Sequence, residues 1–180
     1  MRRDERFGWQ LAGTAIAAFA AGVWCFCAHR SAVVYQPVSF DGCTDAAQIA
    51  MIFLRAFLRT AWPLLLLSAA AFTRFVCPAC FCVMTVRAFP AGLAAGYLYA
   101  VQAWTVYALF LVFTVAVAFL YLYVCCMAYA FAYATDGPVR ALDAPFHARQ
   151  FFLRYLNACG ILVFLTALWC CGCLNGLIRV

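Results

Sequence analysis

The sequence has few of the side chains on which most catalytic sites depend. It contains no lysine, one glutamate and three serines, and its six acidic residues lie near the start of the chain or in polar stretches between apolar segments. No motif that surrounds a serine nucleophile or cradles a phosphate is present. We therefore expect a protein that is not an enzyme.

Metal-binding side chains are equally scarce. The two histidines, His29 and His147, belong to different polar segments, and no carboxylate falls inside an apolar stretch. A metal site needs several such ligands to converge. The sequence therefore predicts no metal and no cofactor.

Apolar residues dominate what remains. They make up 69% of the 180 residues, and charged residues make up 10%, against about 25% charged in a soluble domain. All twelve basic residues are arginine, and most flank apolar segments, where arginine orients membrane helices and meets anionic headgroups. We expect an all-α, polytopic transmembrane helix bundle in the lipid bilayer of a bacterial cell membrane, and no binding to nucleic acid.

The apolar segments predict about five spans in a single domain. The predicted segments are a first span at 9–28, an extracytoplasmic loop at 31–43, an interfacial helix at 44–59, a broken apolar segment at 61–101, a long span at 104–134, a basic cytoplasmic loop at 135–151 and a last span at 152–174. Arginines place the N-terminus and the loop at 135–151 in the cytoplasm. An even number of crossings must therefore separate them. The first span is one of these crossings, so residues 55–134 must supply an odd number, and three fit their length.

The segment at 61–101 is the least regular part of the chain. Arg74 and Arg87 divide it into stretches that are each shorter than the roughly 20 residues needed to cross a membrane, and Pro90 removes a backbone donor. We expect short interrupted helices here. A charge inside a bilayer is costly, so Arg74 and Arg87 are candidates for contact with a partner or ligand, unless they only mark helix ends at the interface.

Two glycines follow this proline at helical spacing. Gly92 and Gly96 form a small-xxx-small pair, which lets two helices approach closely in a membrane. Together with Phe89 and Pro90 they are candidates for contact with a structural partner or a ligand.

Cysteine is abundant, at twelve residues. Cys77 and Cys80 form a CxxC pair with proline between them, a spacing that supports thiol–disulfide exchange. At this abundance about one CxxC spacing is expected by chance, and Cys170 and Cys173 form a second. The alternative, which we favour, is that these cysteines are small buried apolar side chains.

The run from FLRAFLRT to FPAGLAAGYLY resembles the core of the stage II sporulation protein M family of small polytopic bacterial membrane proteins. The resemblance covers residues 45–100, with Arg87, Ala88, Phe89, Gly92 and Gly96 at the family's basic-Gly-Phe element and its following glycines. Ala88 replaces the usual glycine, and Cys-Pro-Ala-Cys replaces a glycine-rich interruption. The resemblance implies a membrane scaffold that assembles with cell-wall remodelling partners during sporulation and engulfment.

Three functions remain as expectations. The first is a non-catalytic integral membrane scaffold that holds other membrane or cell-wall proteins, as a homo- or hetero-oligomer. The second is a small-molecule transporter or the substrate-binding membrane subunit of one, because short proline-interrupted segments are typical of helices around a transport site. The third is a membrane thiol-disulfide oxidoreductase that uses Cys77 and Cys80.

Overall fold

The computed structural model describes residues 3–29, 46–73, 75–101, 104–135 and 144–174. Its five α-helices are α1 (Arg3–Ala28), α2 (Ala46–Ala70), α3 (Val76–Ala100), α4 (Trp104–Thr135) and α5 (Ala144–Leu174). Each helix contains a stretch of 21 to 29 residues that is long and apolar enough to cross a membrane. The predicted all-α class with five potential spans is confirmed, and the fold is compatible with a multi-pass membrane protein.

The predicted short interrupted helices near 61–101 are wrong. α2 runs for 25 residues through Pro63 and α3 for 25 residues through Pro90, and the predicted interfacial helix at 44–59 is the first part of α2. A proline removes one backbone hydrogen bond, but in apolar surroundings the other backbone groups are best satisfied by a continuous helix. Arg87 therefore lies inside a helix and not at a break.

The chain turns between α2 and α3 at a threonine. The Thr73 backbone N–H and hydroxyl both donate to the Ala70 carbonyl, each at 2.9 Å, and the Thr73 hydroxyl oxygen accepts from the Phe75 N–H at 3.3 Å. A side chain that bonds nearby backbone groups in this way competes with the helix and ends it. Arg74 follows Thr73 and lies outside the described residues.

The last helix begins earlier than the sequence predicts. α5 starts at Ala144, so part of the segment at 135–151 that was predicted as a loop is helical. Proline is tolerated in the first turn of a helix because its missing N–H would be unbonded there, and Pro145 lies in that turn. The predicted loop at 31–43 lies outside the described residues.

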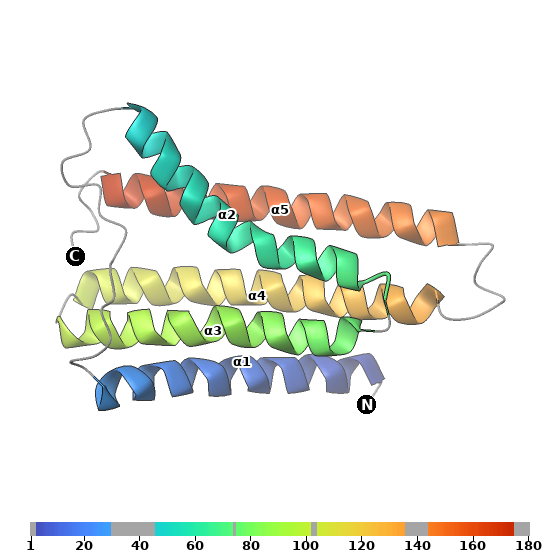
Figure 1. Cartoon of the computed structure of the whole chain (residues 1–180), viewed down its shortest axis with the longest axis horizontal. Coiled ribbons are helices and arrows are strands. Elements are labelled where there is room, and N and C mark those ends of the chain that lie inside the picture. The colour runs from blue at the N-terminus through green and yellow to red at the C-terminus, as the bar shows by residue number, and fades with distance from the viewer. Residues whose placement is uncertain (1–2, 30–45, 74, 102–103, 136–143, 175–180) are drawn as a thin grey trace.

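The helices form a bundle in which neighbours in sequence run in opposite directions (Figure 1). α1 contacts α3 and α4, α5 contacts α4 and α2, and α2 contacts α3, α4 and α5. Figure 1 also shows the start of α1, the end of α4 and the start of α5 at one end of the bundle. This placement agrees with an even number of crossings between the two arginine-rich segments.

The buried core lies in the half of the bundle where α1 begins. On α4 it contains Val117, Tyr121, Val124 and Ala128, which recur every three or four residues and so face one side of the helix. In the other half α2 diverges (Figure 1), and none of its side chains from 47 to 58 is buried. The bundle is thus closed at one end and splayed at the other.

Candidate functional site

A charged side chain lies near the middle of the bundle, on α3. The guanidinium carbon of Arg87 lies 5.3 Å from the centroid of the Tyr121 ring on α4. Tyr121 is 1% exposed, and Arg87 is half-buried. A guanidinium over an aromatic face is held by cation–π attraction, which strengthens away from water. An ionisable side chain at this depth is a candidate for function by default.

The register of α3 turns Arg87 toward the neighbouring helices. Cys80, Val83 and Met84 are buried, and residue 87 falls on the same face one helical turn later. Because the chain continues through Pro90 without a break, this register persists to the end of α3. The continuous helix therefore fixes the guanidinium inside the bundle.

A second polar group in this region is the hydroxyl of Tyr155 on α5. Tyr155 is 7% exposed, and within the part of the chain that the structure describes its hydroxyl has no hydrogen-bond partner. Its polar neighbours are Cys159, Ser68 and Tyr121. The Ser68 hydroxyl donates to the Leu65 carbonyl at 2.7 Å, and its oxygen can still accept. A buried hydroxyl left unbonded costs about 1–3 kcal/mol, so a ligand oxygen that accepts from it would be stabilised.

These side chains belong to four helices, and we refer to them as the central polar cluster. Its members are Ser68, Arg87, Tyr121, Tyr155 and Cys159. Tyr121 connects Arg87 with Tyr155. Its ring lies under the Arg87 guanidinium, and its hydroxyl is close enough to Tyr155 to interact with it electrostatically. The cluster holds one positive charge and the buried hydroxyl of Tyr155.

The glycines that the sequence singles out form the contact between α1 and α3. A Cβ atom on Gly92 would collide with the backbone carbonyl of Phe19, and a Cβ atom on Gly22 would collide with the backbone carbonyl of Phe89. Helix pairs in membranes gain stability from such close backbone packing. The predicted small-residue face therefore packs against α1 of the same chain.

The contact continues one turn further along both helices. A Cβ atom on Gly96 would lie 3.0 Å from the Phe26 ring, and that ring packs edge-on against Tyr97 with centroids 6.2 Å apart. Pro90, by contrast, is exposed. Of the predicted residues, Phe89, Gly92 and Gly96 thus serve helix packing, and Arg87 alone belongs to the central polar cluster.

The predicted redox pair consists of free thiols. Cys80 is fully buried, and its thiol donates to the Cys125 carbonyl at 3.7 Å; Cys77 is half-buried. Thiol exchange needs a thiolate that a partner can reach, so this packing favours the interpretation of Cys80 as a small buried side chain. In the described part of the chain, no three His, Cys, Asp or Glu side chains are placed to hold a metal ion.

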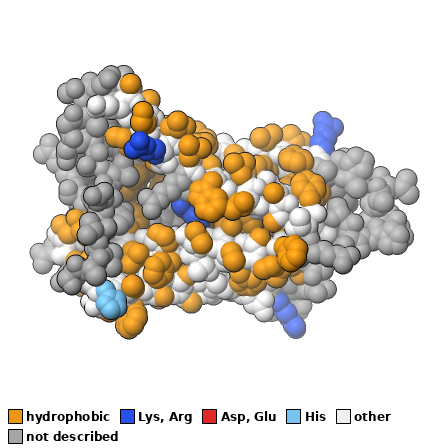
Figure 2. Space-filling model, viewed as in Figure 1, with side chains coloured by type: hydrophobic (Ala, Val, Ile, Leu, Met, Phe, Trp, Pro, Cys, Tyr) orange, Lys and Arg blue, Asp and Glu red, His pale blue; other side chains and the backbone are white. Residues whose placement is uncertain are grey.

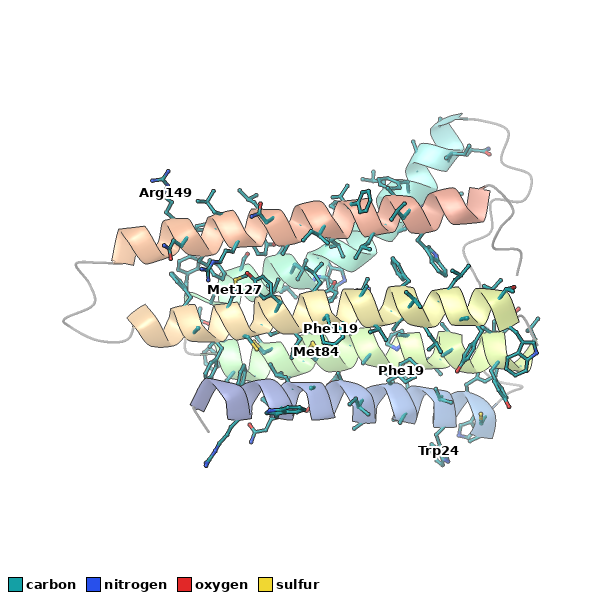
Figure 3. All side chains as sticks on the ribbon, turned by 180° about the vertical axis from the view of Figure 1, so that it is seen from behind. Phe19, Trp24, Met84, Phe119, Met127 and Arg149 are labelled. Atoms are coloured by element: carbon teal, nitrogen blue, oxygen red, sulfur yellow. The ribbon has the colours of Figure 1, made fainter. Side chains whose placement is uncertain are left out.

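Basic side chains other than Arg87 are exposed wherever the structure describes them, at Arg6, Arg55, Arg149 and Arg154. Arg149 projects away from the bundle near the start of α5 (Figure 3). In the space-filling view, hydrophobic side chains are spread over the part of the face that is not grey, and basic atoms lie toward its margins and also near its middle (Figure 2). The charge of Arg87 is therefore set apart from the others by its depth.

Sequence reasoning missed Tyr121, Tyr155 and Gly22. Nine tyrosines occur in the chain, and nothing in an uncharged stretch distinguishes the one that lies under an arginine. The sequence does contain a signal for Gly22. Ala18 and Gly22 on α1 show the same small-xxx-small spacing as Gly92 and Gly96 on α3.

Comparison of the chain with protein-family models, curated proteins and solved structures gave no match. The resemblance to stage II sporulation protein M therefore stays a prediction.

Proposed function

We propose that this chain is a multi-pass membrane protein that binds an anionic ligand at Arg87, as a small-molecule transporter or as its substrate-binding subunit. One observation carries the proposal. Arg87 lies near the middle of an apolar helix of 25 residues, and its guanidinium is held over the buried Tyr121 ring. An arginine at membrane depth is costly and characteristically marks a ligand or ion site.

The chemistry of the central polar cluster supports binding over catalysis. A guanidinium presents several donors in a planar fork that suits carboxylate and phosphate oxygens. Contact with the Tyr121 ring helps to orient that fork. The Tyr155 hydroxyl supplies a further donor nearby. Positive charge and hydroxyl donors of this kind suit an anion.

The proposed orientation places the N-terminus in the cytoplasm of a bacterial cell. Arg2, Arg3 and Arg6 precede or begin the first span, and Arg140, Arg149 and Arg154 flank the junction of α4 and α5. Of these, Arg6 on α1 and Arg149 and Arg154 on α5 lie toward the starts of their helices, which share one end of the bundle (Figure 1). Cytoplasmic ends of membrane helices are enriched in arginine.

The non-catalytic scaffold is the second candidate, and α2 favours it. Met51, Leu54 and Leu58 are each more than half exposed on one helical face of the part of α2 that diverges. In a scaffold, this face would hold a spanning helix of a membrane or cell-wall partner. Photocrosslinking at Leu54 in cells tests it, with Ile16 on α1, which is also more than half exposed, as the control. Protein adducts at Leu54 alone favour the scaffold, and equal adducts at both sites argue against it.

Ligand binding is tested with purified protein in nanodiscs of zwitterionic lipid. We expect saturable binding of organic anions that Arg87→Gln weakens by about tenfold or more, because a buried charge-assisted contact is lost. Arg149→Gln is the matched control, since Arg149 is exposed at the end of α5. If both variants change binding equally, surface charge accounts for it and the proposed site is wrong.

A further inference from the structure

We propose that Tyr99, Trp104 and Tyr107 anchor the turn between α3 and α4 in the headgroup region of a phospholipid bilayer. We refer to these three residues as the turn cluster. The inference goes beyond the proposed function, because it concerns the depth of the fold in the membrane and requires no ligand at Arg87. Its support comes from the packing of the rings, from their exposure and from the charge of the surrounding sequence.

The rings of the turn cluster pack against one another across the turn. The Tyr99 ring on α3 lies edge-on to the Trp104 ring on α4, with centroids 5.3 Å apart. The Tyr107 ring, about one turn further along α4, has its centroid 6.1 Å from that of Tyr99 and 6.4 Å from that of Trp104. Aromatic pairs of this geometry contribute about 0.5–1.5 kcal/mol each beyond the area that they bury. The cluster therefore joins the end of α3 to the start of α4.

The exposure of these rings indicates the partner. Tyr99 and Trp104 are each 57% exposed, and Tyr107 is half-buried. Tyrosine and tryptophan combine an apolar ring with a polar O–H or N–H group, so they favour a boundary that is apolar on one side and wet on the other. The headgroup region of a bilayer is such a boundary, and both residue types are enriched there. Phospholipid ester and phosphate oxygens would accept from the polar groups, and acyl chains would contact the rings.

The sequence around the turn carries no charge that could mark the membrane surface. Residues 88–135 include no Asp, Glu, Lys or Arg, although α3 ends at Ala100 and α4 begins at Trp104 within this stretch. The turn must reach the surface all the same, because backbone groups at helix ends lack partners inside the helix and hydrocarbon supplies none. Aromatic rings are the remaining interfacial side chains at this turn.

A further tryptophan lies at the same end of the bundle. The end of α1 lies beside the end of α3 and the start of α4 (Figure 1). Trp24, in the last turns of α1, is 71% exposed and points away from the bundle (Figure 3). Exposed aromatic side chains on two sides of the bundle match a belt at one membrane surface. Under the proposed orientation, this surface is the extracytoplasmic one.

The anchor sets the depth of α3. Tyr99 follows Arg87 by twelve residues, which corresponds to about 18 Å along an α-helix. Half of a typical hydrocarbon core is about 15 Å thick. A turn cluster in the headgroup region therefore places Arg87, and the Tyr121 ring beneath it, near the centre of the bilayer.

The test measures the depth of Trp104 by fluorescence quenching in vesicles of brominated phosphatidylcholine. The full chain carries Trp9→Phe, Trp24→Phe, Trp62→Phe and Trp169→Phe, so that Trp104 is its only tryptophan. We expect lipids brominated near the headgroup to quench Trp104 more strongly than lipids brominated near the end of the acyl chain, because indole rings at an interface lie above most of the acyl chain.

The matched control moves the tryptophan along the same helix. It carries Trp104→Phe and Phe119→Trp in the same background. Phe119 is 67% exposed and lies near the middle of α4 (Figure 3), about 22 Å along the helix from residue 104. We expect the order of quenching to be reversed in this variant.

Two outcomes overturn the inference. If the deep bromines quench Trp104 more strongly, the turn lies inside the hydrocarbon. If neither lipid quenches it, water or a protein partner surrounds the ring. Should the single-tryptophan protein not fold, the wild-type protein is compared with Trp104→Phe, because the difference in quenching isolates Trp104, and the same outcomes apply. A failed anchor leaves anion binding at Arg87 standing, and unchanged binding in Arg87→Gln leaves the anchor standing, so the two failures are distinguishable.

Discussion

The Cα atom of Gly22 on α1 lies 3.1 Å from the point where a Cβ atom on Gly92 of α3 would sit, and the reverse distance is also 3.1 Å. The two helices therefore meet backbone to backbone. Because lipid tails are as apolar as the side chains, helices in a membrane associate through close packing more than through the hydrophobic effect. This contact fixes α3, and with it the register that directs Arg87 into the bundle.

Alanine at either glycine should destabilise the protein. The added Cβ meets a backbone carbonyl, which cannot move aside as a flexible side chain can, and overpacking of this kind costs about 1–3 kcal/mol. We expect Gly22→Ala and Gly92→Ala to lower the thermal midpoint in detergent. Gly13→Ala on α1 and Gly160→Ala on α5 are the controls, since a Cβ atom there meets nothing within 4 Å. Equal loss in all four variants would show that helix flexibility, and not the α1–α3 contact, is responsible.

The ring of Tyr121 should matter more to ligand binding than its hydroxyl. Cation–π attraction of about 0.5–2 kcal/mol orients the Arg87 guanidinium, and phenylalanine preserves the aromatic face. We expect Tyr121→Phe to bind the anionic ligand nearly as well as the wild-type protein, and Tyr121→Leu to bind it roughly three- to thirtyfold more weakly. Isothermal titration with the same anion checks both. Stronger loss in the phenylalanine variant would mean that the hydroxyl, and not the stacked ring, serves the site.

The number of spans and several helix ends could be predicted from the sequence, as for α4, predicted at 104–134 and observed at Trp104–Thr135. The breaks within 61–101 could not. Charges and prolines at 74, 87 and 90 suggest three short pieces, but only the turn at Thr73 ends a helix. Local signals overestimate breaks, because backbone groups in apolar surroundings have no partner outside the helix. Arg87 stays helical because its charge is accommodated by Tyr121, a residue distant in sequence.

The candidate site could be predicted only in part. Arg87 stands out because a charge in an apolar stretch is rare. Its partners do not, since Tyr121 and Tyr155 become relevant only when the packing of α3, α4 and α5 brings them together. The sequence predicts that Gly92 lies in a close helix contact, but it does not identify the partner, which is Gly22 on α1. The periodicity of a helix is visible within its own sequence. Which residues of two helices contact each other is not, because those residues are far apart in the chain.

The two ends of the bundle should lie on opposite sides of the membrane. Under the proposed topology, five crossings place the N-terminal end of α1 and the C-terminal end of α5 on opposite sides, with the first in the cytoplasm. We expect a green fluorescent protein fused before residue 1 to be fluorescent in bacteria, and an alkaline phosphatase fused after residue 174 to be active. A fusion in the segment 136–143 tests the same model independently, since phosphatase there should be inactive. Active phosphatase at 136–143 would contradict the proposed topology.

Cys80 should behave as a packing residue and not as a redox thiol. It is 0% exposed, so removing its sulfur leaves a small cavity that costs about 1 kcal/mol, and a membrane-impermeant maleimide should react with it only after unfolding. We expect Cys80→Ala to lower the thermal midpoint, whereas Cys82→Ala, at an exposed position of the same helix, should stay within about 0.5 kcal/mol of the wild-type protein.

The double variant Cys77→Ser, Cys80→Ser in cells should leave disulfide formation in exported proteins unchanged. Rapid maleimide labelling of Cys80 in the folded protein, or loss of disulfide formation in the double variant, would restore the oxidoreductase hypothesis, because both require a thiol that a partner reaches.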